Sequence, residues 1–281
     1  MPDSITSPSN KRIQWLHALH DAKGRADAGA FLVEGPHAVE GALDAQIRPV
    51  VIAYEPTQLS RSETGMRVLG RIGALAATGV EVLITSPAAI ERASDAQSPQ
   101  GVVMAISREE VAPERVRARR RGRNRPLVLV LDRVSDPGNV GTLLRSALAA
   151  DVDEVLLSAG CADPWAPKVL RAGVGAQFTV PLRTGLTWEH IGQQLGKTPV
   201  VLADGEARET YDQLDLTTRA ALIVSNEAHG ASAEAQALAT VRVRIPMWNR
   251  VESLNAAIAG SVILFEAARQ RRAKQTTEEQ G

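Results

Sequence analysis

Short, continuously apolar runs alternate with amphipathic helical segments through the second half of the chain. An apolar run without polar alternation is typical of a strand buried on both faces, and the helices between such strands supply the covering layers. The pattern therefore predicts an α/β domain of three layers around a mostly parallel sheet. The predicted strands are Leu127–Asp132, Glu154–Ser158, Phe178–Pro181, Val200–Ala203, Ala221–Ser225 and Val241–Ile245, and the predicted helices are Asn139–Ala150, Trp188–Leu195, Ala233–Leu238 and Ser253–Lys274.

The first part of the chain carries a second α/β pattern, with strand-type runs at Phe31–Val33, Val50–Tyr54, Val80–Thr85 and Gly101–Ile106 and helical patterns over Lys11–Ala22 and His37–Gln46. Seven arginines within residues 115–125 follow it. Such a block is either a solvated linker or a strip that binds phosphate, and the block alone does not decide between them. We predict a small α/β domain over residues 1–107, a partly helical linker over 108–125 and the larger domain over 126–281.

Composition excludes several classes of protein. The 281 residues are 44% apolar, enough to bury a sizeable core, but only 3% aromatic, which argues against a base-stacking platform built from several aromatic rings. The single cysteine, Cys161, rules out an internal disulfide framework, and the five histidines form no HExxH or paired metal-ligand spacing, so no metal is expected. The polar first thirty residues are not a signal peptide, and the longest apolar stretch, Ala256–Phe265, is too short to span a membrane. We expect a cytoplasmic protein.

Three loops at predicted strand ends carry unusual polar residues, and ligands of parallel sheets bind at such ends. In the first loop, Asp136-Pro137-Gly138 forms a turn and Asn139 is a plausible helix N-cap. Arg145 follows inside an otherwise apolar helix, where an unpaired buried charge is expensive. Arg145 is therefore expected either to pair with a carboxylate or to face a site, whereas the turn itself needs no functional explanation.

The second and third loops are polar in the same way. In the second, Glu227 follows a strand and could simply help a helix to start, and His229 alone is weak evidence for catalysis. In the third, Pro246 ends a strand and Ser253 is the predicted N-cap of the last helix. Asn255 would then lie inside that helix, an unfavourable position unless a function uses it. The inward face of this helix is expected to contain Leu254, Ala257, Ile258, Ser261, Val262 and Phe265.

Together, in this order and spacing, the three loops resemble the SpoU family of RNA ribose 2′-O-methyltransferases, within the SPOUT superfamily. The family motifs read approximately N-x-G-x-x-x-R, G-N-E-x-x-G and I-P-M-x-G-x-x-x-S-L-N, and here they stand as residues 139–145, 225–230 and 245–255. The match covers residues 127–272. Residues 24–36 and 100–103 are similar to the substrate-binding domain that often precedes this catalytic domain, a domain related in fold to a small RNA-binding ribosomal protein.

The resemblance implies S-adenosylmethionine as methyl donor, a carboxy-terminal trefoil knot and a homodimer whose knotted helices pack together near the active site. It implies that Arg145 is the central catalytic group, that Glu227 is its ionic partner, and that Asn139, Glu227, Ser253 and Asn255 surround it. Because arginine is a poor base, we expect Arg145 to orient the ribose hydroxyl and stabilise developing negative charge. The implied donor-binding residues are Ala203, Asp204, Ser225, Gly230, Ile245 and Leu254, and the implied RNA-binding residues are Arg25, Arg119, Arg120 and Arg121.

Two residues depart from the motifs, because Ser225 and Asn249 stand where the family has glycine. Asparagine tolerates left-handed backbone geometry, whereas serine is less suited to a close approach by the donor. The departures leave open a non-catalytic RNA-binding or assembly protein with the same fold. A nucleotide-binding oxidoreductase is a weaker alternative, since the glycines of Arg171–Gly175 lack a third glycine and a following helix. The sequence does not distinguish ribosomal from transfer RNA as substrate.

Overall fold

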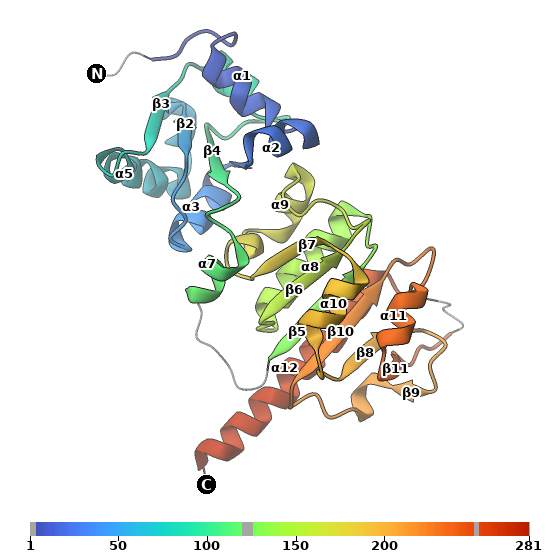
Figure 1. Ribbon diagram of the computed structural model, residues 1–281. Helices are drawn as coiled ribbons and strands as arrows, with labels where there is room; N and C mark the ends of the chain where they lie inside the picture. Colours follow the sequence, from blue (N-terminus) through green and yellow to red (C-terminus); the bar gives the residue numbers. More distant parts are fainter. Residues whose placement is uncertain (1–3, 120–125, 250–252, 281) are drawn as a thin grey trace. The chain divides into compact units, whose positions relative to one another are not determined.

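The computed structural model describes residues 4–119, 126–249 and 253–280 of the chain, which divides into two compact units (Figure 1). The first unit contains residues 1–112 and 165–178, and the second contains residues 113–164 and 179–281. This division differs from the predicted boundaries at two places. A segment from the middle of the chain joins the first unit, and the second unit takes up the chain from Pro113.

The second unit is built on a seven-stranded sheet in which every described strand pair is parallel, with the order β7-β6-β5-β10-β8-β11-β9. The strands are β5 (Leu127–Asp132), β6 (Glu154–Ser158), β7 (Leu182–Leu186), β8 (Val200–Ala203), β9 (Glu209–Thr210), β10 (Ala220–Ser225) and β11 (Val241–Arg244). The helices are α7 (Pro113–Ala118), α8 (Pro137–Ala149), α10 (Trp188–Leu195), α11 (Ala233–Leu238), α12 (Ala256–Gln280) and the 3₁₀ turn η2 (Tyr211–Gln213). The predicted parallel α/β architecture is confirmed.

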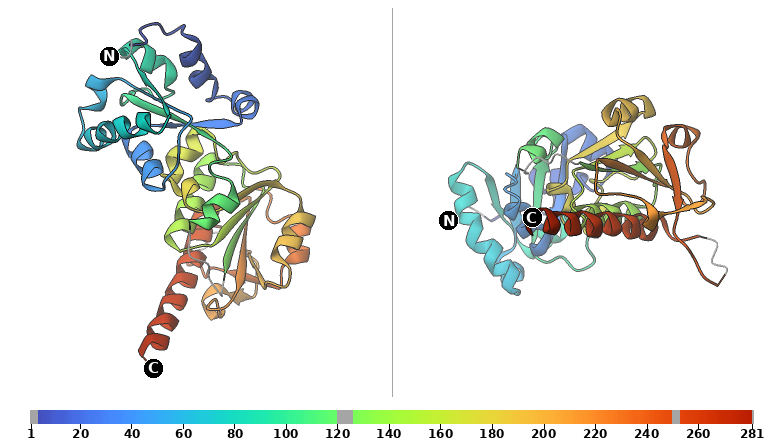
Figure 2. Two further views of the ribbon diagram at one scale, coloured as in Figure 1. Left: turned by 60° about the vertical axis from the view of Figure 1, so that its left-hand side comes forward. Right: turned by 90° about the horizontal axis from the view of Figure 1, so that it is seen from below.

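Helices cover both faces of this sheet, as Figure 2 shows. Successive residues of a strand point to opposite faces, and β10 illustrates the result. Ala221 and Ile223 pack into a core cluster with α10 and α11. Val224 points the other way and packs against α12, which in turn lies on α8. The central strands are consequently buried on both faces, which explains their lack of polar alternation.

Helix α12 begins at Ala256, three residues later than predicted, and its inward face also differs from the prediction. Ile258 and Phe265, both expected to face the core, are 53% and 51% exposed. The buried positions of α12 are Ala256, Ala257, Gly260, Ile263, Leu264 and Ala267. The apolar residues of this helix cover more than one face, so their spacing alone could not identify the inward one.

Gly260 sets how closely α12 approaches the rest of the unit. A Cβ atom at this position would lie 2.5 Å from Leu143 Cδ2 of α8 and 2.9 Å from Val224 Cγ2 of β10, closer than packed carbon atoms allow. We therefore expect Gly260→Ala to destabilise the unit by about 1–3 kcal/mol through overpacking. The control is Gly192→Ala in α10, where the added methyl group would make an ordinary 3.6 Å contact with Leu238.

Thermal unfolding followed by circular dichroism would compare the two glycine variants. The Gly260→Ala protein should melt at a lower temperature than the natural protein, and the Gly192→Ala protein at the same temperature or higher, because alanine favours helix. Equal melting temperatures for the two variants would contradict the close packing of α12.

The first unit contains a four-stranded mixed sheet in the order β1-β4-β2-β3, with β4 antiparallel to both neighbours and β2 parallel to β3. The strands are β1 (Ala30–Glu34), β2 (Val51–Tyr54), β3 (Glu81–Ile84) and β4 (Val102–Ser107). The helices are α1 (Lys11–Ala18), α2 (Ala22–Ala28), α3 (Pro36–Asp44), α4 (Pro56–Leu59), α5 (Glu63–Ala77), α6 (Pro87–Ala93), α9 (Pro167–Gly173) and the 3₁₀ turn η1 (Ala176–Phe178). No helix among the described residues has the length and apolar character that a membrane crossing requires.

Aromatic packing explains why the segment 165–178 belongs to the first unit. The ring of Phe31 in β1 stacks on Trp165 at 4.6 Å and lies 6.4 Å from Phe178. Phe178 is therefore a buried residue of a 3₁₀ turn. The predicted strand Phe178–Pro181 is wrong, and the corresponding strand β7 begins at Leu182. The ring of Phe178 is buried by tertiary packing and not within a sheet.

The arginine-rich region begins as part of the second unit. Val116 of α7 is buried, and Arg117 forms an ion pair with the buried Glu154 of β6 at 2.7 Å. Arg183 bonds the same carboxylate at 2.8 Å and reaches Glu114 of α7, also at 2.8 Å. A buried carboxylate needs such partners, so this short helix is fixed to the sheet. The rest of the predicted linker, residues 120–125, lies outside the described residues.

Candidate active site

A cavity of about 400 Å³ opens at the carboxyl ends of β8, β10 and β11. Its walls are the residues that follow these three strands and the beginning of α12. All six residues predicted to bind the methyl donor line this one cavity: Ala203, Asp204, Ser225, Gly230, Ile245 and Leu254. Because the three strands are neighbours in the sheet, loops that are distant in the sequence converge at one edge.

The cavity wall combines apolar surface with polar and charged side chains. Val224, Met247 and Ile263 contribute apolar atoms. Asp204 is held in place by Arg242, whose Nε donates to Asp204 Oδ2 at 2.6 Å. The Ser225 hydroxyl is buried and has no hydrogen-bond partner among the described residues. A cavity of this size, lined by both apolar and polar groups, can hold a nucleoside-sized ligand, which could give the Ser225 hydroxyl a hydrogen bond.

Three predicted site residues form one hydrogen-bonded network beside the cavity. Glu227 Oε1 accepts hydrogen bonds from Asn139 Nδ2 at 2.9 Å and from the backbone N–H of Ala256 at 2.6 Å. Asn139 Oδ1 in turn accepts from Asn255 Nδ2 at 2.9 Å. The network therefore ties together the beginning of α8, the loop after β10 and the beginning of α12.

The network also corrects two predicted helix caps. Asp136, and not Asn139, caps α8, since its Oδ1 accepts from the backbone N–H of Asn139 at 2.8 Å. Asn255, and not Ser253, caps α12, since its Oδ1 accepts from the N–H groups of Ala257 and Ile258 at 3.0 and 3.2 Å. Asn255 thus precedes the helix, where asparagine is favoured. Ser253 is exposed and lines the cavity.

Of the two roles expected for Arg145, pairing with a carboxylate or facing a site, neither is imposed by burial. Arg145 is on the exposed face of α8, whose buried residues are Val140, Gly141, Leu143, Leu144 and Ala147. The described residues show no ion pair between Arg145 and Glu227, which is bonded to Asn139 and Ala256 instead. An exposed guanidinium costs little to leave unpaired, so Arg145 remains available to a ligand that approaches α8 from solvent.

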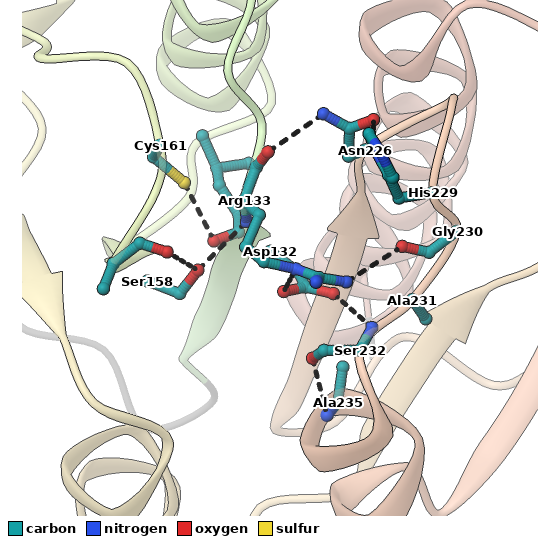
Figure 3. A network of polar contacts seen from close by, with 12 residues as sticks. Asp132, Arg133, Ser158, Cys161, Asn226, His229, Gly230, Ala231, Ser232 and Ala235 are labelled. Atoms are coloured by element: carbon teal, nitrogen blue, oxygen red, sulfur yellow. Dashed lines mark hydrogen bonds and ion pairs between the residues drawn. The ribbon is translucent and has the colours of Figure 1, made fainter.

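A second network fixes the base of the loop after β10 (Figure 3). Asp132, which is fully buried at the end of β5, accepts a hydrogen bond from the Ser232 N–H at 2.7 Å. Asn226 Nδ2 donates to the Arg133 carbonyl at 3.1 Å. Cys161 Sγ is 3.2 Å from the Leu131 carbonyl, and burial raises the pKa of its thiol, so this cysteine is not a reactive thiolate. The loop that carries Glu227 is therefore anchored at both ends.

Family models match both halves of the chain. The model of the SpoU rRNA methylase family matches residues 126–265, and that of an MRM3-like substrate binding domain matches residues 10–104. A tRNA/rRNA methyltransferase of Synechocystis, itself uncharacterised, is 33% identical over 97% of this chain and 96% of its own length. The chain belongs to the SpoU rRNA methylase family.

Two further relatives of this SpoU chain are informative. The 23S rRNA (guanosine(2553)-2′-O)-methyltransferase RlmP of Bacillus subtilis is 29% identical over 93% of this chain and 97% of its own length. The crystal structure of an AdoMet-bound rRNA methyltransferase from Sinorhizobium meliloti superimposes with a TM-score of 0.81 at 28% identity, covering 95% of this chain and 97% of that one. The likeness therefore extends over both units of the chain.

The two departures from the SpoU motifs have different structural consequences. Asn249 has a φ of 60°, so the left-handed conformation expected of asparagine at this position is confirmed. Ser225 lies at the end of β10, in register with Asp132 of β5. It needs no glycine-like backbone, and the side chain here adds a hydroxyl group that finds no partner within the part of the chain that the structure describes. The departure at 225 therefore changes the chemistry of the cavity wall more than its backbone.

The four arginines predicted to bind RNA lie in different environments. The prediction that Arg25 contacts RNA is wrong. Its side chain is only 3% exposed, and its Nη1 donates to the carbonyls of Leu19 and His20 at 3.2 and 2.7 Å. Arg119 is exposed, and Arg120 and Arg121 lie outside the described residues. An arginine of the substrate-binding motif, here within α2, can thus serve to hold backbone carbonyls together, a role that charge patterning does not reveal.

Sequence reasoning missed several residues of the cavity wall, among them Arg242, Arg244 and Gln236. A signal for the two arginines was present. They alternate with Val241 and Val243 along β11, and such alternation places both on the same, more polar side of the strand. Among the described residues, no group of three histidine, cysteine, aspartate or glutamate side chains is arranged to hold a metal ion.

Proposed function

We propose that this protein transfers a methyl group from S-adenosylmethionine to a ribose 2′-hydroxyl group of ribosomal RNA. The observation that carries the proposal is the convergence of the six predicted donor-binding residues on one cavity, with Glu227 both lining the cavity and bonding Asn139. The name of the Bacillus subtilis relative supports the 2′-O position, and the AdoMet-bound structure from Sinorhizobium meliloti supports the donor. The expected location in the cytoplasm remains a prediction.

The residues around the cavity fit the proposed donor. S-adenosylmethionine, when bound, supplies a methyl group made electrophilic by a positively charged sulfur. Three carboxylates, Asp204, Glu206 and Glu227, line the cavity against two arginines, Arg242 and Arg244, so the charge of this wall is compatible with a cationic ligand. The apolar atoms of Val224 and Ile263 offer a surface for a flat base, and the unpartnered hydroxyl of Ser225 could bond a polar edge.

We assign Arg145 to the RNA and not to the donor. Arg145 lies six residues beyond Asn139, about 9 Å along the helix axis, and long side chains on a helix lean back towards its amino end. Its guanidinium stays protonated and can bind a phosphate oxygen while it orients the neighbouring hydroxyl and stabilises negative charge developing on that oxygen. The network of Asn139, Glu227 and Asn255 would keep α8 fixed in front of the cavity.

We extend the proposal to the expected homodimer and to the trefoil knot. The exposed Ile258 and Phe265 lie seven residues apart on α12, hence on one face of the helix, and a second copy of the chain could cover them. After β11, near one edge of the sheet, the chain returns to its centre as α12, which packs on β10 and α8. Such a return path is compatible with a knot. Arg119, Arg120 and Arg121 stay predicted contacts to RNA phosphates.

Two measurements test the function. Titration calorimetry with S-adenosylmethionine should give a saturable heat of binding at one site per chain. Incubation with unmodified ribosomal RNA and the donor should protect single positions against alkaline cleavage, because a methylated 2′-oxygen cannot attack the adjacent phosphate. RNA binding without donor binding would instead identify a non-catalytic assembly protein, and protection of transfer RNA alone would replace the proposed substrate.

A further inference from the structure

The loop after β10 carries a histidine that neither the family motif nor the networks described above use. His229 is exposed and lines the donor cavity, next to Gly230 (Figure 3). Among the described residues that line this cavity it is the only histidine. Imidazole is the side chain whose ordinary protonation change falls near neutral pH, which makes its proton state at this position consequential.

The surrounding hydrogen bonds determine how the amide of Asn226 is oriented. Its Nδ2 donates to the Arg133 carbonyl at 3.1 Å and to Ser135 Oγ at 3.2 Å. Its Oδ1 accepts from the Ala228 N–H at 2.9 Å. A flipped amide would set its NH₂ group against the Ala228 N–H and its oxygen against the Arg133 carbonyl, so the oxygen must be the atom that faces the loop.

This orientation assigns the tautomer of His229. Its Nδ1 lies 3.3 Å from Asn226 Oδ1, an oxygen that only accepts hydrogen bonds. The contact is a hydrogen bond only if Nδ1 carries the proton. In the neutral ring the other nitrogen, Nε2, then has a free lone pair and acts as an acceptor. The hydrogen bond to Asn226 thus leaves His229 Nε2 able to accept a proton.

We propose that His229 Nε2 accepts the proton of the ribose 2′-hydroxyl group during methyl transfer, an inference that rests on the proposed function. As the bond from the 2′-oxygen to the methyl carbon forms, the bond from that carbon to sulfur breaks. The electron pair of this bond stays on sulfur, which becomes a neutral thioether. The hydroxyl proton moves to Nε2, and the resulting imidazolium, being exposed, returns it to water.

Arg145 and Glu227, the other groups in the proposed mechanism, are less suited to accept this proton. Arg145 stays protonated, and Glu227 Oε1 already accepts two hydrogen bonds. The charged residues that share the cavity wall with His229 are Asp204, Glu206, Glu227, Arg242 and Arg244. Arg133 approaches the loop from β5, and its Nη2 lies 3.5 Å from the Gly230 carbonyl. The cavity wall that carries the imidazole therefore holds groups of both signs.

The variant His229→Gln tests the assignment. Glutamine can still donate to Asn226 but has no titratable group, so we expect kcat for ribose methylation to fall by about 10²- to 10⁴-fold. The acidic limb of the pH–rate profile, where protonation of His229 removes the acceptor, should disappear. The Kd for S-adenosylmethionine, measured by calorimetry, should stay within about twofold of the natural value because the loop keeps its hydrogen bonds.

The matched control is His190→Gln. His190 lies at the beginning of α10, where its Nδ1 bonds Thr187 Oγ1 at 2.8 Å, and it does not line the cavity. This variant should keep the natural rate and pH profile. A His229→Gln enzyme with the natural rate and an unchanged acidic limb would overturn the proposal while leaving the methyltransferase function intact. A natural protein that binds no donor would overturn the proposed function, and this proposal with it.

A measurement without the donor tests the tautomer directly. Long-range ¹H–¹⁵N correlation spectra of the protein at a pH above the titration of its histidines should show His229 as the Nδ1–H form. The Nε2–H form would contradict the assignment, because Nε2 would then have no lone pair for the proton. The signal of His229 is identified by its disappearance in the His229→Gln variant.

Discussion

Replacement of Arg145 by alanine is expected to lower the rate of ribose methylation by about 10²- to 10³-fold, the usual effect of removing a group that stabilises charge developing on a reacting oxygen. Arg145 is exposed on α8, and the other side of this helix is buried against the unit. The substitution should therefore leave the melting temperature unchanged. Single-turnover methylation of unmodified ribosomal RNA, with the donor in excess, would measure the rate.

The control for Arg145→Ala is Arg219→Ala. Arg219 is also exposed, but it precedes the amino end of β10, whereas the cavity lies at the carboxyl ends of the strands. Its loss should not change the rate. Arg145 lies outside the cavity wall, so the Kd for S-adenosylmethionine should be the same in both variants and in the natural protein. A natural rate in the Arg145→Ala enzyme would remove this arginine from the mechanism.

The sequence allowed accurate prediction wherever a strand is buried on both faces. The bounds of β5, β6 and β8 agree residue for residue with the predicted strands, because the interior of each is continuously apolar and turn residues follow it at once. Phe178–Pro181 shows the limit. Its residues are as apolar as those of a strand, but Phe178 is buried by packing on Phe31, a partner far away in the sequence. Local patterning does not identify such partners.

The sequence allowed us to predict which residues lie at the candidate site, but not which of their side chains hydrogen-bond to one another. The family resemblance identified six of the residues that line the cavity, because parallel strands bring their carboxyl ends to one edge. Which side chain bonds which was not predictable. Glu227 was expected to bind Arg145, but the geometry gives it Asn139 and the N–H of Ala256. The reason is that Asp136 caps α8 and so leaves the Asn139 side chain free to turn towards Glu227.

This pairing leads to the second large effect. Glu227→Ala should lower the methylation rate by about 10²-fold, because Asn139 and the start of α12 would lose the acceptor that positions them, and a misplacement of about 1 Å costs that much. It should also destabilise the second unit by about 1 kcal/mol, since the partly buried Ala256 N–H would lose its hydrogen bond. Thermal unfolding and single-turnover methylation would measure the two effects on one preparation.

The variant Glu227→Gln separates the hydrogen bonds from the charge. Its amide oxygen can accept from both Asn139 and Ala256, so the melting temperature should stay near the natural value. The rate should fall less than in Glu227→Ala, because a neutral oxygen holds the same donors more weakly than a carboxylate does. If the two variants lost activity equally while only Glu227→Ala lost stability, the negative charge itself would be required, and positioning of Asn139 would not explain the role of Glu227.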